Sequence, residues 1–334
     1  MLNLTTIIKD DMGEQRKAHC PVIISASRAT DIPAFYSEWL VNRIKLGYVK
    51  WKNPFSGEYS YVSFEKARLF VFWTKNPEQL MHKLQYFDDM GYNYYFQYTL
   101  NDYEAEKWEP HLPSLDKRIE TFTKLSEKIG KEKVIWRFDP IIITEMLYPE
   151  KILERIKRIG DQIHGYTERM VFSFIDVDCY KKVKSNLALL SEEIREIAPT
   201  AINELAKGIS DLNKKWDLEL GTCAEILNMS KYGIEHNRCI DDRLIVKLFS
   251  EDAELMKYIG IDTDQITVES VLPQYSYSKI KDKGQRKACG CIQSKDIGQY
   301  DTCPHGCVYC YANSNPQKAM ENYKKTGTAS EMLL

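Results

Sequence analysis

The heptapeptide KVIWRFD at residues 133–139 shows the pattern that decides the fold of this chain. It is a short apolar run, rich in β-branched and aromatic residues, and it ends in charged side chains. Such a run predicts a strand that is buried on both faces. Five similar runs are PVIISAS at 21–27, RLFVFWT at 68–74, YYFQYTL at 94–100, RMVFSFID at 169–176 and DLELGTC at 217–223.

Helical patterns fill most of the intervals between these runs. The first begins at Asp31, which suits an N-cap, and ends before Gly47, which suits the position after a helix. Pro149 suits the first turn of another helix. The predicted helices are 31–47, 77–90, 114–130, 149–164, 184–195 and 200–215. The segment at 51–64 differs, because its Asn-Pro and Ser-Gly pairs predict a hairpin or an ornamented loop.

The alternation of strands and helices predicts an α/β architecture. A strand–helix–strand order implies parallel strands joined by right-handed crossovers. Six such units predict a TIM-like, parallel (β/α) barrel or partial barrel, and a doubly wound open sheet is the alternative. We expect residues 1–280 to form this barrel-like domain and 281–334 to form a cysteine-rich segment packed on its mouth. With 334 residues, 43% of them apolar, the chain can bury such a core.

Charge and hydropathy limit the classes of function. Charged residues make up 28% of the chain and nearly cancel to a net charge of −2, so no basic footprint for nucleic acid is predicted. No apolar stretch approaches the length needed to cross a membrane. Lys9, Asp10 and Asp11 stand where the apolar segment of a signal peptide would continue. We therefore expect a cytoplasmic protein with no membrane partner.

The nine cysteines are unevenly distributed. Cys20, Cys179, Cys223 and Cys239 are scattered, whereas Cys289, Cys291, Cys303, Cys307 and Cys310 lie close together. In a reducing compartment, such a group predicts metal ligation or chemistry rather than disulfides.

The sequence CPHGCVYC at 303–310 places three cysteines, Cys303, Cys307 and Cys310, in a C-x3-C-x2-C motif. Three thiolates at this spacing suit three irons of a [4Fe–4S] cluster, and the fourth iron has no local cysteine. An open iron is what a chelating cosubstrate needs. Pro304 and Gly306 favour an irregular loop around the cluster.

This motif resembles the signature of radical SAM enzymes, closest to subfamilies such as the spore photoproduct lyase group, and Tyr309 matches the aromatic residue before the last cysteine. The resemblance implies that S-adenosylmethionine binds the open iron and is cleaved to a 5′-deoxyadenosyl radical. It also implies an electron donor such as a ferredoxin or flavodoxin. In that superfamily the motif follows the first barrel strand. Here it follows all the predicted units, so the C-terminal loop must return to the barrel mouth.

Three other functions stay open. One is an electron-transfer or regulatory iron–sulfur protein that does not cleave S-adenosylmethionine. Another is a DNA-repair protein similar to spore photoproduct lyase, and a third is a hydrolytic barrel stabilised by zinc. In the zinc alternative, Cys289, Cys291 or His305 supplies the fourth ligand. The sequence indicates no substrate and no catalytic residue.

A second metal site is also predicted. Cys223 ends a predicted strand, Cys239 lies in a loop-like segment, and CGC at 289–291 holds two thiols close together. Together Cys223, Cys239, Cys289 and Cys291 would complete a second iron–sulfur cluster. The alternative is that Cys223 packs as a small buried residue, as free cysteines commonly do.

Polar side chains stand where the predicted strands end, and in barrels these ends form the active site. Arg28 and Arg137 suit a carboxylate, including that of a methionine moiety, and Asp139, Asp176 or Glu225 suits ribose hydroxyls or a substrate. The alternative is that Arg137 pairs with Asp139 while Asp31 only caps a helix. The full set of predicted cofactor-binding residues is Arg28, Asp31, Lys75, Arg137, Asp139, Asp176, Glu225 and Tyr309.

Several segments spread over the chain resemble an uncharacterised prokaryotic family, the domain of unknown function numbered 1848. This resemblance implies a C-terminal cysteine cluster similar to that of radical SAM proteins and no established reaction. The segments that carry it are IISASRATDIPAF at 23–35, FWTKNP at 72–77, WRFDPI at 136–141, TCAE at 222–225 and CGCIQSKDIGQYDTCPHGCVYCYAN at 289–313.

Overall fold

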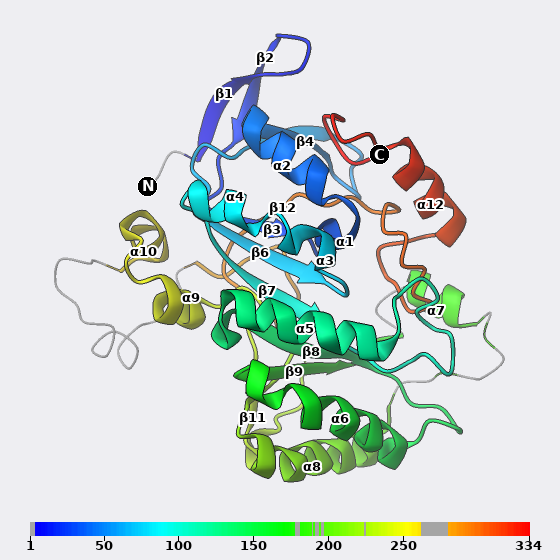
Figure 1. Ribbon diagram of the computed structural model, residues 1–334. Helices are drawn as coiled ribbons and strands as arrows, with labels where there is room; N and C mark the ends of the chain where they lie inside the picture. The colour runs from blue at the N-terminus through cyan, green and yellow to red at the C-terminus, as the bar shows by residue number, and fades with distance from the viewer. Residues whose placement is uncertain are drawn as a thin grey trace.

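An eight-stranded, wholly parallel sheet forms the centre of the computed structural model (Figure 1). The model describes residues 4–177, 181–188, 190, 194, 197–223, 225–261 and 280–334. The strands are β3 (Ile23–Ala26), β6 (Leu69–Thr74), β7 (Asn93–Thr99), β8 (Val134–Ile141), β9 (Arg169–Phe174), β10 (Glu219–Thr222), β11 (Ile234–His236) and β12 (Lys295–Asp296). All six predicted runs are therefore strands.

The strand order makes this sheet barrel-like. Within this sheet each strand from β3 to β10 pairs with the next strand of the same sheet along the chain, and the last strand, β12, pairs with the first, β3. No ladder joins β11 to β12 in the described residues, but the backbone N–H of Ile292 donates to the carbonyl of Ile240 at 3.1 Å. A hydrogen bond thus crosses the seam that the strands leave. The predicted α/β fold with parallel, barrel-like strands is confirmed.

Helices cover the outside of the sheet, and α5, α6 and α8 lie along one another in Figure 1. The α-helices are α1 (Ile32–Phe35), α2 (Ser37–Leu46), α3 (Glu78–Met81), α4 (Leu84–Asp89), α5 (Leu115–Ile129), α6 (Pro149–Ile163), α7 (Lys181–Leu187), α8 (Pro199–Trp216), α9 (Asp242–Phe249), α10 (Ala253–Ile259) and α12 (Pro316–Lys325). Short 3₁₀ turns are η1 (Lys131–Lys133), η2 (His164–Tyr166) and η3 (Ser230–Tyr232).

The helix ends follow the capping residues in the sequence. Asp31 Oδ1 accepts from the N–H of Ala34 and caps α1, and Gly47 ends α2 with φ of +83°. The predicted helix at 31–47 is therefore present but is interrupted at Tyr36. Pro149 is the first residue of α6, as predicted. The predicted helix at 184–195 overlaps α7, and part of its second half lies outside the described residues.

A second, four-stranded sheet has the order β1-β2-β5-β4. Its strands are β1 (Thr5–Lys9), β2 (Gln15–His19), β4 (Tyr48–Lys52) and β5 (Tyr59–Ser63). The antiparallel pair β4–β5 is the hairpin predicted near 51–64, beginning slightly earlier in the chain. The segment 281–334 also joins the main fold, because it supplies β12 to the eight-stranded sheet.

The two faces of each central strand have different neighbours. On β8, Trp136 and Phe138 belong to the large core under the helices, while Ile135 belongs to the smaller core inside the sheet. Side chains alternate along a strand, so Arg137 must share the inner face with Ile135. The inner face is apolar at its amino end and polar towards its carboxyl end, where Gln97, Arg137 and Ser173 follow Tyr95, Ile135 and Val171. A polar pocket at the carboxyl end is the result.

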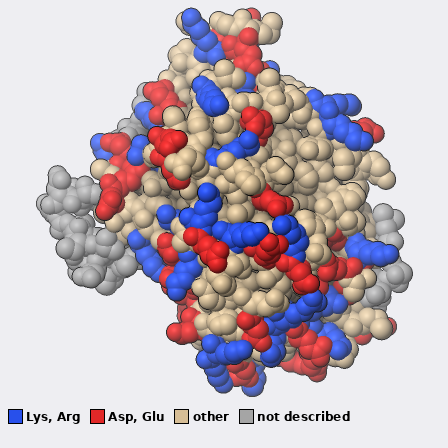
Figure 2. Space-filling model, viewed as in Figure 1, with Lys and Arg blue, Asp and Glu red and all other residues tan. Residues whose placement is uncertain are grey.

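Charges of both signs are interspersed on the face seen in Figure 2, over α5, α6 and α8. Lys157 pairs with Asp161, Lys207 with Asp211, and Lys124 with Glu120. This face gathers no basic stripe. Among the described residues, no helix is both long and apolar enough to cross a membrane.

Candidate functional site

A cavity of about 330 Å³ opens at the carboxyl ends of the central strands. It is lined by turns after β3, β6, β8 and β9 and by the C-terminal segment. Fourteen of the fifteen predicted site residues line it: Arg28, Asp31, Lys75, Arg137, Asp139, Asp176, Cys223, Cys239, Cys289, Cys291, Cys303, Cys307, Tyr309 and Cys310. The fifteenth, Glu225, lies just behind the wall and accepts the N–H of Phe174 at 2.9 Å.

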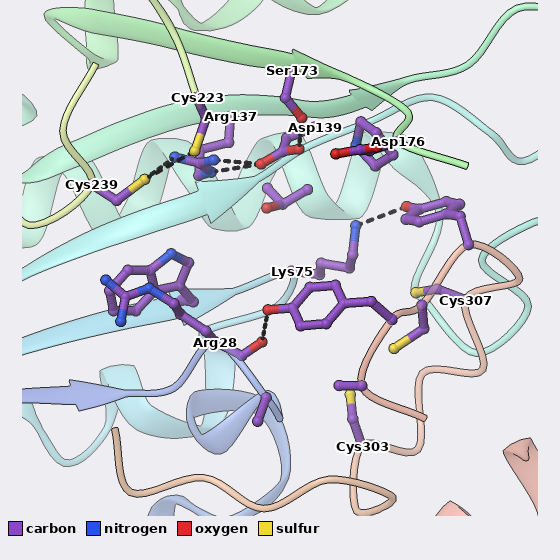
Figure 3. A pocket seen from close by; sticks show the side chains of 18 of the residues that line it. Arg28, Lys75, Arg137, Asp139, Ser173, Asp176, Cys223, Cys239, Cys303 and Cys307 are labelled. Carbon is purple, nitrogen blue, oxygen red and sulfur yellow. Dashed lines mark hydrogen bonds and ion pairs between the residues drawn. The ribbon is translucent and has the colours of Figure 1, made fainter. Parts of the chain in front are cut away.

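Cys303, Cys307 and Cys310 line this cavity from one loop. In Figure 3, Cys303 and Cys307 lie on the side opposite Cys223 and Cys239. Each of the three thiols borders the cavity and is otherwise surrounded by protein. Burial raises the pKa of Cys303 to about 12 and raises the pKa of Cys307 and Cys310 as well. As free groups they are therefore thiols at neutral pH, and a bound metal would have to displace their protons.

The cysteine loop is fastened to the turn after β3, the first strand of the barrel. His305 Nε2 lies 2.7 Å from Asp31 Oδ2, and the Tyr311 hydroxyl donates to the carbonyl of Arg28 at 2.6 Å. The Tyr36 hydroxyl donates to the carbonyl of Thr302 at 2.6 Å. The loop thus returns to the barrel mouth, as its place in the sequence required. Asp31 does more than cap α1.

Gly306 lets the loop turn between Cys303 and Cys307. Its φ is +72°, and a β-carbon there would lie 3.2 Å from Pro110 and 3.3 Å from His111 Nδ1. His111 is fixed in that place because its Nδ1 lies 2.7 Å from the carbonyl oxygen of Pro304. Any larger residue would meet both backbone strain and contact.

A buried polar triad stands beside the loop. Lys75 Nζ lies 2.6 Å from Glu109 Oε1 and 3.0 Å from the Tyr309 hydroxyl, which also donates to Glu109. Burial favours neutral Glu109, but the charges of Lys75 and Arg118 outweigh it and lower its pKa. Burial likewise opposes charged Lys75, whose pKa the carboxylate raises. Glu109 was not predicted, because it lies in the long loop between β7 and α5 and belongs to no motif.

Arg137 and Asp139 form an ion pair inside the mouth, the alternative left open by the sequence. Arg137 Nη1 also donates to Gln97 Oε1 at 3.1 Å and to Cys239 Sγ at 3.2 Å. Asp139 in turn accepts from the Ser173 hydroxyl. Burial opposes ionisation of Asp139, yet the charge of Arg137 keeps its pKa below the ordinary value.

Arg28 lines the cavity beside Trp73. Its guanidinium lies over the Trp73 ring at 4.6 Å, and its backbone N–H donates to Asp296 Oδ2 at 2.8 Å. Its Nη2 is buried without a hydrogen-bond partner among the described residues. A buried guanidinium nitrogen in that state suits an anionic ligand.

The second cysteine group lies on the far side of the same cavity. Cys223 Sγ and Cys239 Sγ are 3.4 Å apart, and the backbone N–H of Ile240, next to Cys239, donates to Cys291 Sγ at 3.4 Å. In the described part of the chain, no three His, Cys, Asp or Glu side chains converge as ligands of one metal ion.

Asp176, Glu225, Cys20 and Cys179 remain to be placed. Asp176 lines the cavity and pairs with Arg286 at 2.7 Å. Burial raises the pKa of Glu225. Cys20 is buried away from the cavity, and Cys179 lies outside the described residues.

Comparisons with known proteins identify the family of this chain. No curated protein matches this sequence. A solved structure that matches is a protein assigned as an α-L-fucosidase from Bacteroides thetaiotaomicron VPI-5482, with 12% identity and a TM-score of 0.25, over 78% of this chain and 86% of that chain. The model of the family described as Domain of unknown function (DUF1848) matches residues 23–312. The chain therefore belongs to the DUF1848 family.

Proposed function

We propose that this protein is an iron–sulfur enzyme similar to radical SAM enzymes, with its cluster held by Cys303, Cys307 and Cys310. The observation that carries the proposal is that these three thiols face one cavity from a loop fastened over the end of the first barrel strand. The motif comes last in the chain, and the contacts of its loop with the turn after β3 support the proposal.

The residues present suit the cluster and its cosubstrate. Three thiols of one loop match three irons, and the described residues offer no fourth thiol within that loop. Arg28 lines the same cavity, and its guanidinium suits the carboxylate of S-adenosylmethionine. When bound, a cluster of this type supplies one electron that cleaves a carbon–sulfur bond of S-adenosylmethionine.

The chain's own polar groups would orient the ligand and hold protons. Lys75 lies between the two cysteine groups in Figure 3, and its charge faces the cavity while Glu109 compensates it. Tyr309 fixes the direction of Lys75 through its hydroxyl. Asp139, held ionised by Arg137, offers a carboxylate to a hydroxyl-bearing ligand at the opposite wall.

The experiment is anaerobic reconstitution with iron and sulfide, followed by addition of dithionite and S-adenosylmethionine. We expect formation of 5′-deoxyadenosine, and loss of that product in the Cys303→Ala/Cys307→Ala/Cys310→Ala variant. Cys20→Ala is the matched control, because Cys20 is also buried but does not line the cavity.

Three results would contradict the proposal and identify its rivals. Iron that responds to dithionite but not to S-adenosylmethionine, in spectra or product, would indicate an electron-transfer or regulatory iron–sulfur protein. Zinc in place of iron would indicate the zinc-stabilised barrel. Salt-dependent binding to damaged DNA, with no product from S-adenosylmethionine alone, would favour DNA repair.

A further inference from the structure

Four cysteines outside the loop motif gather at one point of the barrel mouth. Cys223 directly follows β10, Cys239 lies three residues after β11, and Cys289 and Cys291 come shortly before β12. They belong to three separate segments, so sequence neighbourhood does not explain the gathering. It arises at the seam of the barrel, where the N–H of Ile292 meets the carbonyl of Ile240.

Contacts bring three of these cysteines together. Cys223 Sγ lies 3.4 Å from Cys239 Sγ, and the backbone N–H of Ile240, the residue after Cys239, donates to Cys291 Sγ at 3.4 Å. Cys239, Cys289 and Cys291 are buried, and all four side chains line the cavity. A buried free cysteine normally packs alone as a small apolar residue. Four cysteines from three segments on one side of a cavity do not fit that role.

A positive charge lies beside these sulfurs. Arg137 Nη1 donates to Cys239 Sγ at 3.2 Å, and this guanidinium also pairs with Asp139. Four thiolates around a [4Fe–4S] core leave a net negative charge, which the Arg137 guanidinium would compensate in part.

We propose that Cys223, Cys239, Cys289 and Cys291 bind a second iron–sulfur cluster, of the [4Fe–4S] type with a thiolate on every iron. A cube holds its thiolates farther apart than one zinc ion does, because each thiolate binds a different iron. Four cysteines line this side of the cavity, one for each iron of the cube, and Cys223 and Cys239, whose sulfur atoms lie 3.4 Å apart, would separate to bind different irons. This cluster has no open iron, so it binds no cosubstrate, in contrast to the loop motif.

The test uses the Cys303→Ala/Cys307→Ala/Cys310→Ala variant, purified and reconstituted without oxygen, in which the second site is intact. We expect it to retain about four irons with matching sulfide. Its reduced EPR signal should not change when S-adenosylmethionine is added. Adding Cys239→Ala and Cys291→Ala should remove this iron, whereas adding Cys20→Ala should leave it.

The outcomes separate this proposal from the proposed function. If the wild type and the triple variant bind equal amounts of iron, the loop motif binds no cluster and the second site binds one. An iron-free triple variant with native circular dichroism would overturn the second cluster. Stoichiometric zinc at the site, or a Cys223–Cys239 disulfide in anaerobic protein, would overturn it too. Because the first measurement leaves all four ligands in place, a poorly folding Cys239 variant does not spoil the test.

Discussion

His305 Nε2 lies 2.7 Å from Asp31 Oδ2, and this contact joins the cysteine loop to the end of the first barrel strand. The same carboxylate accepts the N–H of Lys75 at 2.7 Å and the hydroxyl of Thr74 at 2.7 Å. Asp31 therefore connects the helix cap, the end of β6 and the loop through one buried side chain.

Asp31→Ala should lower the stability of the protein and its retention of iron together. The substitution leaves buried donors of Thr74, Lys75 and His305 without an acceptor, which costs about 1–3 kcal/mol for each group that water cannot reach. Thermal unfolding and iron content after anaerobic reconstitution would measure both effects. Ser114→Ala, which removes the cap of α5, should lower stability without loss of iron. Equal iron loss in both variants would contradict the anchoring role of Asp31.

Gly306→Ala should disturb the cysteine loop. A residue other than glycine at φ of +72° costs about 1–2 kcal/mol, and its β-carbon would press on Pro110 and His111. We expect slower uptake of iron and faster loss to a chelator. Gly165→Ala is the control, since its β-carbon would meet nothing within 4 Å and its φ is not positive. If Gly306→Ala takes up and loses iron at wild-type rates, the turn at Gly306 does not determine the geometry of the cysteine loop.

Asp161 should contribute to stability at neutral pH and lose that contribution in acid. Hydrogen bonds from Lys157, Trp216 and Lys215 hold its pKa below the ordinary value, and the bond from Trp216 joins α8 to α6. A carboxyl with a lowered folded pKa stabilises above its unfolded pKa, and the benefit fades as pH falls below about 4. Asp161→Asn should therefore unfold at a lower temperature than the wild type at pH 7, because the substitution lowers the free energy of unfolding by less than about 1 kcal/mol. The difference between the two unfolding temperatures should be smaller at pH 3. An unchanged difference would contradict the prediction.

Arg137→Gln should make the reduction potential of the second cluster more negative. Reduction adds negative charge, which a guanidinium 3.2 Å from Cys239 Sγ stabilises. An EPR-monitored redox titration of the Cys303→Ala/Cys307→Ala/Cys310→Ala protein would measure the shift. Arg169→Gln, at the amino end of β9 and paired with Glu219 and Asp241, should leave the potential unchanged. If the reduction potential shifts equally in both variants, or does not shift in Arg137→Gln, then Arg137 does not tune the potential of the second cluster.

The central strands could be predicted because burial on both faces makes them continuously apolar. Trp136 and Arg137 show the limit of that signal. Alternation assigns them to opposite faces, but only the assembled sheet shows that Arg137 reaches Cys239 across the mouth. The cysteines of the loop motif were predictable from spacing alone. The gathering of Cys223 with Cys291 was predictable only as a possibility, since it depends on how the barrel closes.

The missed features have weak local signals. Lys295 and Asp296 form the two-residue strand β12, whose pairing with β3 comes from tertiary structure and not from an apolar run. Glu109 lies in a charged loop where nothing distinguishes it from its neighbours, and burial beside Lys75 alone makes it part of the site. β12 and Glu109 each take their role from partners distant in the chain.

The pairing of β12 with β3 has a consequence for folding during synthesis. A ribosome delivers residues 23–261 first, and these hold seven of the eight strands but only Cys223 and Cys239 of the seven predicted ligands. Domains tend to fold from the amino terminus during synthesis. The edge of β3 can therefore pair with β12 only after residues 295–296 have been synthesised, and under the two proposals the set of iron ligands is complete only once Cys310 has been added.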